Sequence, residues 1–431
     1  MPPSKCKAKP WMLAGMIIAS LLMQGCGGGG STTAISASTP ATTSPSTTPT
    51  AVAQAKADGA VVNPAIVAAD DGFGLTLFKT LLPGASGNIA ISPLSVSLAL
   101  QILYNGAAGT TQQAMMQTLQ LGALSLQDVN EANAALQASL QDADPLLNII
   151  IANSLWTQDG GSVLPSFTRA DQTYYGATLG DLSGAPANVN AWISSETQGL
   201  ITDILPPGDY QTAVAVLANA VYFKGPWTTA FDPSLTVAQP FTLGDGSQMS
   251  APMMSQSGSY AYLQGANFQA VRLPYGSGRM SMLIVLPDPA VSLASFISSL
   301  TLENLNTWIG ELTMSPGSIG LPRFTATYKA QGLAGVLGSM GMAVALCPPA
   351  GGTNFSALSS QPGVCVSDAE HETVVEVDES GTVAAAATTV TTITSVAFAG
   401  FSMTMNRPFL YAIRDDLTGE LLFLGALMNP A

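Results

Sequence analysis

The chain has 431 residues and carries few charges, since only 9% of its residues are Asp, Glu, Lys or Arg. Against 27 acidic residues stand 13 basic ones, which gives a formal net charge of −14 at pH 7. No basic face can therefore neutralise phosphates, so nucleic acid is excluded as a partner, and the same acidity repels anionic lipid.

The N-terminus has the layout of an export signal. Three lysines within the first nine residues precede an apolar run from Trp11 to Met23. The run is too short for a comfortable membrane span, so we expect residues 1–25 to be a signal peptide. The small residue Gly25 before Cys26 resembles the cleavage site of bacterial lipoproteins, which predicts that Cys26 carries a lipid. A plain secretion signal is the alternative.

The next segment predicts a tether. Residues 27–50 are Gly-rich and then Ser/Thr/Pro-rich, with almost no large apolar side chains, so they cannot build a core. We expect a flexible tether over residues 26–65, with a span of roughly 30 to 40 Å if it is a random coil. Residues 66–431 are ample for one large core, and we expect them to form a single domain.

Two of the four cysteines remain for this domain, Cys347 and Cys365, and they bracket a segment rich in Pro, Gly and Ser. In an oxidising compartment a disulfide between them would stabilise the fold by about 3 kcal/mol in the chain-entropy model. Two free thiols are the alternative. No second cysteine pair or histidine has the spacing of metal ligands, so we expect no metal.

The only histidine, His371, is the one candidate base for a Ser-His-Asp hydrolase. It lies in an alternating strand pattern, and no Gly-x-Ser-x-Gly elbow occurs elsewhere in the chain. The acidic residues around it fall on alternating faces of an extended strand and do not form an acid–base pair: Glu370, Glu372, Glu376, Asp378 and Glu379. We therefore expect no enzyme, with a hydrolase that uses His371 as the alternative.

The segment after this pattern has the composition of a strand held in reserve. Gly381 provides a pivot, and Ala384–Ala387 can enter a sheet without a shaped pocket. Thr388–Thr394 then supply high strand propensity. A low-complexity linker or a short helix is the alternative from this segment alone. In a sheet, alternation would send one set of small residues to the same face: Thr382, Ala384, Ala386 and Thr388.

The flanks of this segment resemble the serpin family of protease inhibitors. Glu372–Glu379 is similar to the strand that leads into the serpin reactive-centre loop, and Glu379–Thr382 followed by alanines resembles the inhibitory hinge. Other blocks match in family order: Asn88–Thr111, Asn190–Ile201, Asn219–Trp227, Leu321–Phe324, Leu333–Met342, Asn406–Ile413 and Phe423–Pro430. The resemblance implies an α+β serpin fold over residues 66–431. It has a large central mixed β-sheet, further sheets, about eight or nine helices and an exposed loop over about residues 379–402.

The resemblance also implies suicide inhibition of serine, or alternatively cysteine, endopeptidases. In the family, the cleaved loop inserts into the main sheet while the protease is still attached as an acyl complex. The implied hinge residues are Glu379, Gly381, Thr382, Ala384, Ala385, Ala386 and Ala387. Family spacing places the scissile bond between Ser395 and Val396, with Val396, Ala397 and Phe398 as alternatives. These small or apolar side chains favour elastase-, subtilisin- or chymotrypsin-like targets.

Serpins further join a histidine on this strand to an asparagine on the central strand and to serines near the first helix. The matching residues are His371, Asn219, Ser92 and Ser95, which would act as a latch on sheet opening. A satisfied core histidine without gating is the alternative.

The expected partner is a target endopeptidase, bound covalently by a monomer that risks loop–sheet polymerisation. We expect no cofactor, membrane contact only through the lipid at Cys26, and an extracytoplasmic location. A non-inhibitory surface protein of the same fold that binds a ligand is the alternative function.

Overall fold

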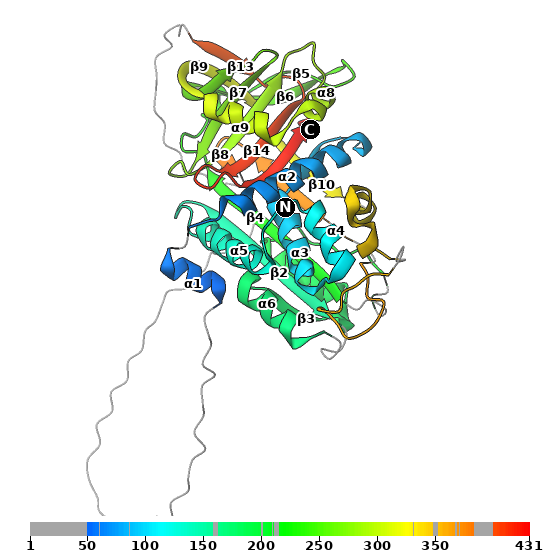
Figure 1. The fold of residues 1–431 in the computed structure, drawn as a ribbon. Helices are drawn as coiled ribbons and strands as arrows, with labels where there is room; N and C mark the ends of the chain where they lie inside the picture. Colours follow the sequence, from blue (N-terminus) through cyan, green and yellow to red (C-terminus); the bar gives the residue numbers. More distant parts are fainter. Residues whose placement is uncertain are drawn as a thin grey trace, which may run out of the picture. The chain divides into compact units, whose positions relative to one another are not determined.

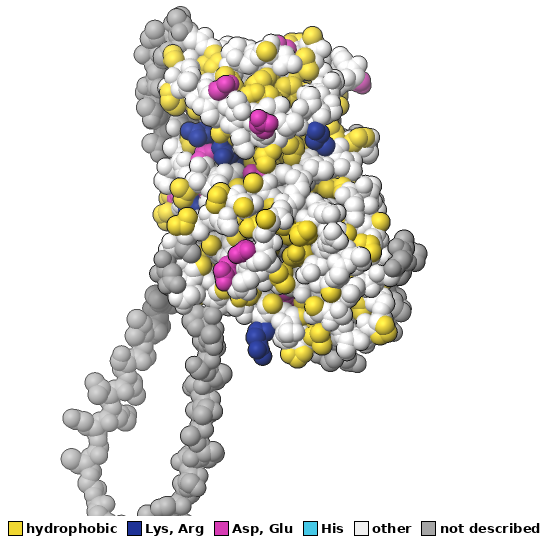
Figure 2. All heavy atoms as spheres, in the orientation of Figure 1, with side chains coloured by type: hydrophobic (Ala, Val, Ile, Leu, Met, Phe, Trp, Pro, Cys, Tyr) yellow, Lys and Arg dark blue, Asp and Glu magenta, His cyan; other side chains and the backbone are white. Residues whose placement is uncertain are grey.

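The computed structural model describes residues 50–59, 61–85, 87–157, 163–199, 201–208, 210, 215–330, 332–347, 352–366, 369, 371–382 and 400–431. Residues 48–431 form one compact unit, and all residues of the described hydrophobic core lie within it. Two β-sheets form its frame, and helices pack against them (Figure 1). Charged side chains are sparse on the face shown in Figure 2, as the composition requires.

The described residues contain ten α-helices, slightly more than the eight or nine expected. They are α1 (Ala51–Asp58), α2 (Pro64–Leu81), α3 (Pro93–Gly106), α4 (Gly109–Thr118), α5 (Leu126–Gln141), α6 (Pro165–Tyr175), α7 (Ala187–Glu196), α8 (Leu293–Ser299), α9 (Leu302–Glu311) and α10 (Leu333–Leu337). Two short 3₁₀ helices matter below, η3 (Pro233–Leu235) and η5 (Ala343–Ala345). No described helix has the length and apolar character needed to cross a membrane.

Helix α1 lies inside the segment that was expected to be a tether, and this differs from the prediction. Its sequence is Ala-rich, the Thr50 side chain accepts from the backbone N–H of Ala53, and Gly59 ends it in the left-handed conformation. Lys56 forms an ion pair of 2.6 Å with Asp142 at the end of α5. Local capping and packing against α5 and α6 therefore order residues whose composition alone suggested a coil.

Nine strands form the larger sheet, in the order β1-β15-β14-β8-β7-β6-β9-β13, with β5 paired to β6. The strands are β1 (Ile89–Ile91), β5 (Val237–Thr242), β6 (Gln248–Gln264), β7 (Phe268–Tyr275), β8 (Met280–Pro287), β9 (Thr313–Pro322), β13 (Phe401–Thr404), β14 (Phe409–Asp415) and β15 (Leu421–Leu427). Strands β8, β14 and β15 are buried along their whole length, which explains why most of their residues are apolar. Arg414 and Asp415 at the end of β14 are the charged exceptions.

In the described part of the chain, the second sheet has six strands in the order β10-β11-β12-β4-β2-β3. They are β2 (Asn148–Thr157), β3 (Thr178–Asp181), β4 (Ala215–Pro226), β10 (Phe324–Ala330), β11 (His371–Val377) and β12 (Gly381–Thr382). Helix α3 is almost completely buried and contacts both β4 of this sheet and β15 of the other. The helix thus fills the space behind the middle of the six-stranded sheet, where the candidate site lies.

Candidate functional site

The two-residue strand β12 lies between β11 and β4. Thr382 pairs with Val377 of β11 on one side and with Gly225 of β4 on the other, and Gly381 pairs with Pro226. Both pairings are antiparallel, so β4 and β11 run parallel to each other. Among the described strands no ladder joins β4 to β11 directly, and β12 is their only link. Within the described ranges, the facing edges of β4 and β11 are therefore unpaired beyond Thr382. We call the space between them the slot, and the start of the predicted hinge lies at one end of it.

Close packing fixes the two residues of β12. A Cβ atom on Gly381 would collide with the carbonyl oxygen of Gly225, so only glycine fits this approach. The side chain of Thr382 is 2% exposed, and its hydroxyl lies 2.6 Å from that of Tyr275. Tyr275 in turn stacks on Trp227, with ring centroids 4.4 Å apart. The indole Nε1 of Trp227 donates to the carbonyl oxygen of Asp378 at 2.9 Å, which ties the turn before β12 to the end of β4.

Glu379, the first residue of the predicted hinge, is held by two partners from other elements. Arg323 donates through Nε to both carboxylate oxygens at 2.7 Å, and the Thr236 hydroxyl donates at 2.5 Å. Burial alone would raise the pKa of Glu379, but the hydrogen bonds from Arg323 and Thr236 outweigh it and hold this pKa below its usual value. The hinge is therefore anchored to the turn between β9 and β10 by a charged group that stays ionised at neutral pH.

The opposite end of the slot opens into a cavity of about 180 Å³. Its walls come from α3, from residues 216–219 of β4, from α10, from residues 364–366 with Ala369, and from His371 at the start of β11. Most lining side chains are apolar. The polar side chains of Ser95, Asn219 and His371 lie at the end of the cavity nearer to β12. An added strand that continued β12 would enter this cavity.

The four predicted latch residues lie together at the entrance to the cavity, joined as a chain and not as one cluster. The Nε2 of His371 accepts from the backbone N–H of Ser92 at 3.0 Å, and the Ser92 hydroxyl accepts from the N–H of Ser95 at 3.2 Å. The Ser95 hydroxyl donates to the side-chain oxygen of Asn219. Among the described contacts no hydrogen bond joins His371 to Asn219. These two residues stand on opposite sides of the slot, each held to the N-terminus of α3.

His371 does not have the properties of a catalytic base. It is 5% exposed, and burial lowers its pKa to about 4, so the imidazole is neutral at pH 7. Its Nε2 already accepts a backbone hydrogen bond, and this requires the proton on Nδ1. The neighbouring acidic residues take structural roles: Glu372 lies 3.6 Å from Lys329, and Glu379 is paired with Arg323. This geometry argues against the hydrolase alternative.

The polar network continues beyond the predicted residues. The Asn219 amide donates to Asn153 of β2, whose own amide donates to Gln137 of α5 at 3.2 Å and to the carbonyl oxygen of Tyr175 at 2.8 Å. Sequence reasoning missed Asn153, Gln137, Tyr275 and Thr236. Asparagine and glutamine in buried strand or helix positions are a signal for such a network, but the pattern does not say which of them meet.

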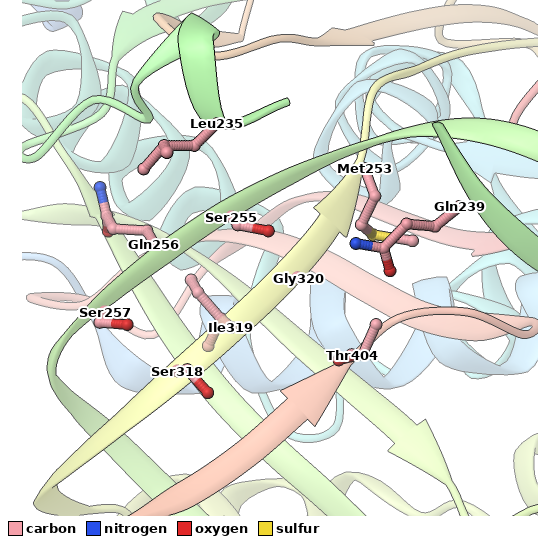
Figure 3. Close-up of a pocket in the computed structure, with 10 residues that line it drawn as sticks. All are labelled: Leu235, Gln239, Met253, Ser255, Gln256, Ser257, Ser318, Ile319, Gly320 and Thr404. Carbon is pink, nitrogen blue, oxygen red and sulfur yellow. The ribbon is translucent and has the colours of Figure 1, made fainter. Parts of the chain in front are cut away.

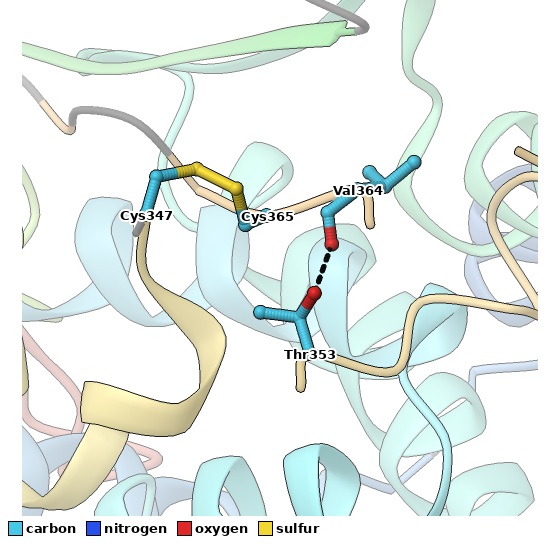
Figure 4. The surroundings of a disulfide bond; sticks show 4 residues. All are labelled: Cys347, Thr353, Val364 and Cys365. Atoms are coloured by element: carbon cyan, nitrogen blue, oxygen red, sulfur yellow. Dashed lines mark hydrogen bonds between the residues drawn. A yellow bond between two sulfur atoms is a disulfide. The ribbon is translucent and has the colours of Figure 1, made fainter. Parts of the chain in front are cut away.

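The structure joins Cys347 and Cys365 by a disulfide with a Cα–Cα distance of 5.4 Å (Figure 4). Cys347 follows η5, and Cys365 lines the cavity at the end of the slot. The predicted pair therefore lies beside the candidate site and not on a remote surface loop.

A second, shallower hollow of about 250 Å³ lies on the nine-stranded sheet (Figure 3). Its lining comes from β5, β6, β9 and β13, with Leu235 of η3 above them in this view. None of its ten lining residues is titratable. Gln256 is already used, since its amide donates to the carbonyl oxygens of Thr229 and Ala230. No group of three or more potential metal ligands occurs in the described part of the chain.

Several predicted sites fall outside the described residues. These are the lipidation site Cys26, Glu370, the hinge alanines 384–387 and the scissile-bond candidates Ser395, Val396, Ala397 and Phe398. The hinge is thus described only through its first members, Glu379 to Thr382.

Comparison with known proteins identifies the family that this fold and this slot define. The family model "Serpin (serine protease inhibitor)" matches residues 68–430, so the chain is a member of the serpin family. It is 32% identical over 368 residues to corticosteroid-binding globulin of Ovis aries, covering 83% of this chain and 84% of that one. It is 31% identical to human serpin B9, covering 83% and 97%.

Solved structures agree with this assignment. The native state of the thermophilic serpin tengpin superimposes with a TM-score of 0.76 at 28% identity, covering 86% of this chain and 95% of that one. The expected α+β serpin fold is confirmed.

Proposed function

We propose that this chain is a suicide inhibitor of endopeptidases, which traps its target by inserting the cleaved loop between β4 and β11. The observation that carries the proposal is the position of β12. Its two residues already lie at one end of the slot and pair with β4 or with both β4 and β11. Insertion of the following residues can therefore begin at Thr382 and continue antiparallel to both strands. A strand that continued β12 would gain ladder hydrogen bonds on both sides, which is favourable once the residues are freed from the loop.

The register of β12 predicts where each later residue would lie. Continued along both neighbours, it puts Ala384 between Phe223 and Val375, and Ala386 between Val221 and Thr373. Thr388 then comes opposite both Asn219 and His371, the two sides of the latch. Thr382, Ala384, Ala386 and Thr388 would all point toward the buried face that α3 covers. Small side chains suit this face, because the inward side chain of Thr382, the last described residue of β12, is already 2% exposed.

The loop composition supports a preference among proteases. Residues 394–398 contain no Lys or Arg, so trypsin-like enzymes are disfavoured and elastase-, subtilisin- or chymotrypsin-like enzymes are favoured. A specificity pocket discriminates between side chains by only about 1–3 kcal/mol, so this preference is graded.

The proposal is tested by incubating residues 48–431 with elastase, subtilisin, chymotrypsin and trypsin, followed by denaturing gels and mass spectrometry. We expect a band at the summed mass with at least one of the first three enzymes. A released C-terminal peptide should begin near Val396 and so locate the scissile bond. Clean cleavage without a covalent band for all of them would contradict inhibition.

A ligand-binding role is the second candidate, because one similar relative is a corticosteroid-binding globulin. The position of β12 between β4 and β11 favours inhibition. A protein that only bound a ligand would not need a hinge of small residues at the start of the slot. Cleavage in the loop separates the two roles. An inserting fold gains a complete strand and should melt far higher after cleavage, whereas a fold that does not insert should melt at nearly the same temperature.

We also propose that Cys26 carries a lipid and that residues 27–49 link the domain to a membrane outside the cytoplasm. The support is the sequence of the first 26 residues and the disulfide, which is typical of oxidising compartments. Cys26→Ser should move the protein from the membrane fraction to the soluble fraction. Unchanged fractionation would exclude the lipid as the anchor.

A further inference from the structure

The disulfide holds one wall of the cavity at the end of the slot. Val364, Cys365 and Val366 line that cavity. Leu346 and Val366 form a parallel β-bridge. The N–H of Cys347 donates to the carbonyl oxygen of Val366 at 2.9 Å, and the N–H of Val366 donates to the carbonyl oxygen of Ala345 at 2.9 Å. The Cys347–Cys365 bond therefore adds a covalent tie to a short backbone pairing between this wall and η5.

The segment between the two cysteines is fixed from the side of α3. The N–H groups of Ala357 and Leu358 donate to the carbonyl oxygen of Gly106 at 3.2 and 3.1 Å. The N–H of Asn354 donates to the Thr111 hydroxyl at 2.9 Å. The Thr353 hydroxyl donates to the carbonyl oxygen of Val364 at 2.6 Å (Figure 4). These contacts hold the middle of the segment, and the disulfide reinforces the backbone pairing that joins its two ends.

This wall lies where the inserting strand would lose its partner on one side. Strand β11 begins at His371, which the proposed register places opposite Thr388. Residues from Val390 onward would still face Val216 and Leu217 of β4, but on the other side they would face the wall of Val364–Val366 and Ala369. The position of that wall therefore controls whether the second half of the strand can dock.

We propose that the Cys347–Cys365 disulfide is a redox-controlled clamp that keeps the far end of the slot ready for the inserting loop, an inference that rests on the proposed function. Both cysteines are half-buried. A small dithiol would supply two electrons and two protons, the S–S bond would break to give two thiols, and the dithiol would become a cyclic disulfide. Residues 364–366 would become more mobile after reduction, and insertion would have to order them again. This entropy cost would slow insertion relative to hydrolysis of the acyl bond.

The experiment uses residues 48–431, which form one compact unit and contain only these two cysteines. Three forms are compared: oxidised, reduced with dithiothreitol and alkylated, and the Cys347→Ser/Cys365→Ser variant. The first readout is the rate at which the protein takes up a synthetic peptide with the sequence of residues 383–395, measured by the gain in melting temperature. The peptide starts at residue 383 because the chain's own Thr382 already fills its position in the slot. The second readout is the number of inhibitor molecules consumed per subtilisin inactivated. We expect uptake at least threefold slower, and higher consumption, in both forms that lack the disulfide.

A control variant separates clamping from general loss of stability. Phe296→Leu weakens the aromatic cluster of Phe268, Phe296 and Trp308, which lies outside the slot and its cavity, so peptide uptake should stay at the oxidised rate. Equal or faster uptake without the disulfide, or equal slowing by Phe296→Leu, would overturn the clamp. If the oxidised protein takes up the peptide but does not inhibit subtilisin, only the proposed inhibitory function is contradicted. Oxidised protein that takes up no peptide would overturn both.

Discussion

At the residue scale, the packing around Gly381 and Thr382 limits which side chains fit between β4 and β11. Gly381 meets backbone atoms of Gly225 and Pro226, and Thr382 fits with a single hydroxyl contact to Tyr275. A charge at either position would be buried without a partner, which costs several kcal/mol. The space between β4 and β11 therefore requires glycine at position 381 and an uncharged, compact side chain at position 382.

Thr382→Arg should convert the proposed inhibitor into a substrate. The guanidinium cannot be buried beside Tyr275, so the strand would start outside the slot and insertion would lose to hydrolysis. We expect cleaved protein and active protease on denaturing gels, with at least a tenfold loss of covalent complex. Thr382→Ser keeps the hydroxyl and should retain inhibition. A stable complex from the arginine variant would show that Thr382 need not enter the sheet.

Glu379→Gln should weaken the anchor of the hinge. The change removes the charge that Arg323 and Thr236 share, but Arg323 is 45% exposed, so the loss is moderate, about 1–2 kcal/mol in the free energy of unfolding. Urea denaturation at pH 7 measures it. Glu372→Gln is the matched control, because its contact with Lys329 is longer at 3.6 Å, and it should change stability by less. Equal losses in both variants would show that the Arg323 pair has no special role.

At the scale of elements, residues of two strands are tied by hydrogen bonds to one helix. His371 on β11 and Asn219 on β4 are both tied to the N-terminus of α3, through Ser92 and Ser95. Separation of the strands must break one of these ties or move with the helix. We therefore expect the four predicted latch residues to oppose early opening of the slot at the end away from β12.

His371→Ala should destabilise the native form and release the latch. Loss of the imidazole leaves the buried N–H of Ser92 without this acceptor and creates a cavity, which together cost about 2–4 kcal/mol. Chemical denaturation measures that loss, and native gels during incubation at 45 °C should show faster polymer formation. Slower or unchanged polymer formation by a destabilised His371→Ala protein would mean that the histidine only fills the core.

At the scale of the whole molecule, several carboxylic acids are buried without enough partners. Burial raises the pKa of Asp70 to about 7, of Asp71 to about 8 and of Asp171 to about 9, and it raises that of Glu420 well above its usual value. Neither carboxylate oxygen of Asp171 or Glu420 has a hydrogen-bond partner among the described residues. The fold therefore retains protons that the unfolded chain releases near pH 4.

The stability of residues 48–431 should fall as the pH rises from about 6 to 9.5. These acids have higher pKa values in the folded state, so their contribution is complete below about pH 4 and is lost as the pH passes through 7 to 9. Melting temperatures across this range measure the slope. Asp171→Asn removes one titrating group and should flatten the curve at its alkaline end. A melting temperature that rises with pH, or an unchanged slope in Asp171→Asn, would contradict this account.

The sequence by itself determined the family, the chain order of its matching blocks and the pair of cysteines, and it predicted a hinge, because each depends on local residue types at short spacing. Only the tertiary structure decided that Thr382 already lies between β4 and β11 and that Tyr275 and Thr236 hold the hinge. The same is true of the link between His371 and Asn219, which runs through α3. These contacts join residues far apart along the chain, such as Thr236 with Glu379 and Ser92 with His371. The physical reason is that side-chain pairing across a core depends on how sheets and helices pack, which local propensity does not encode.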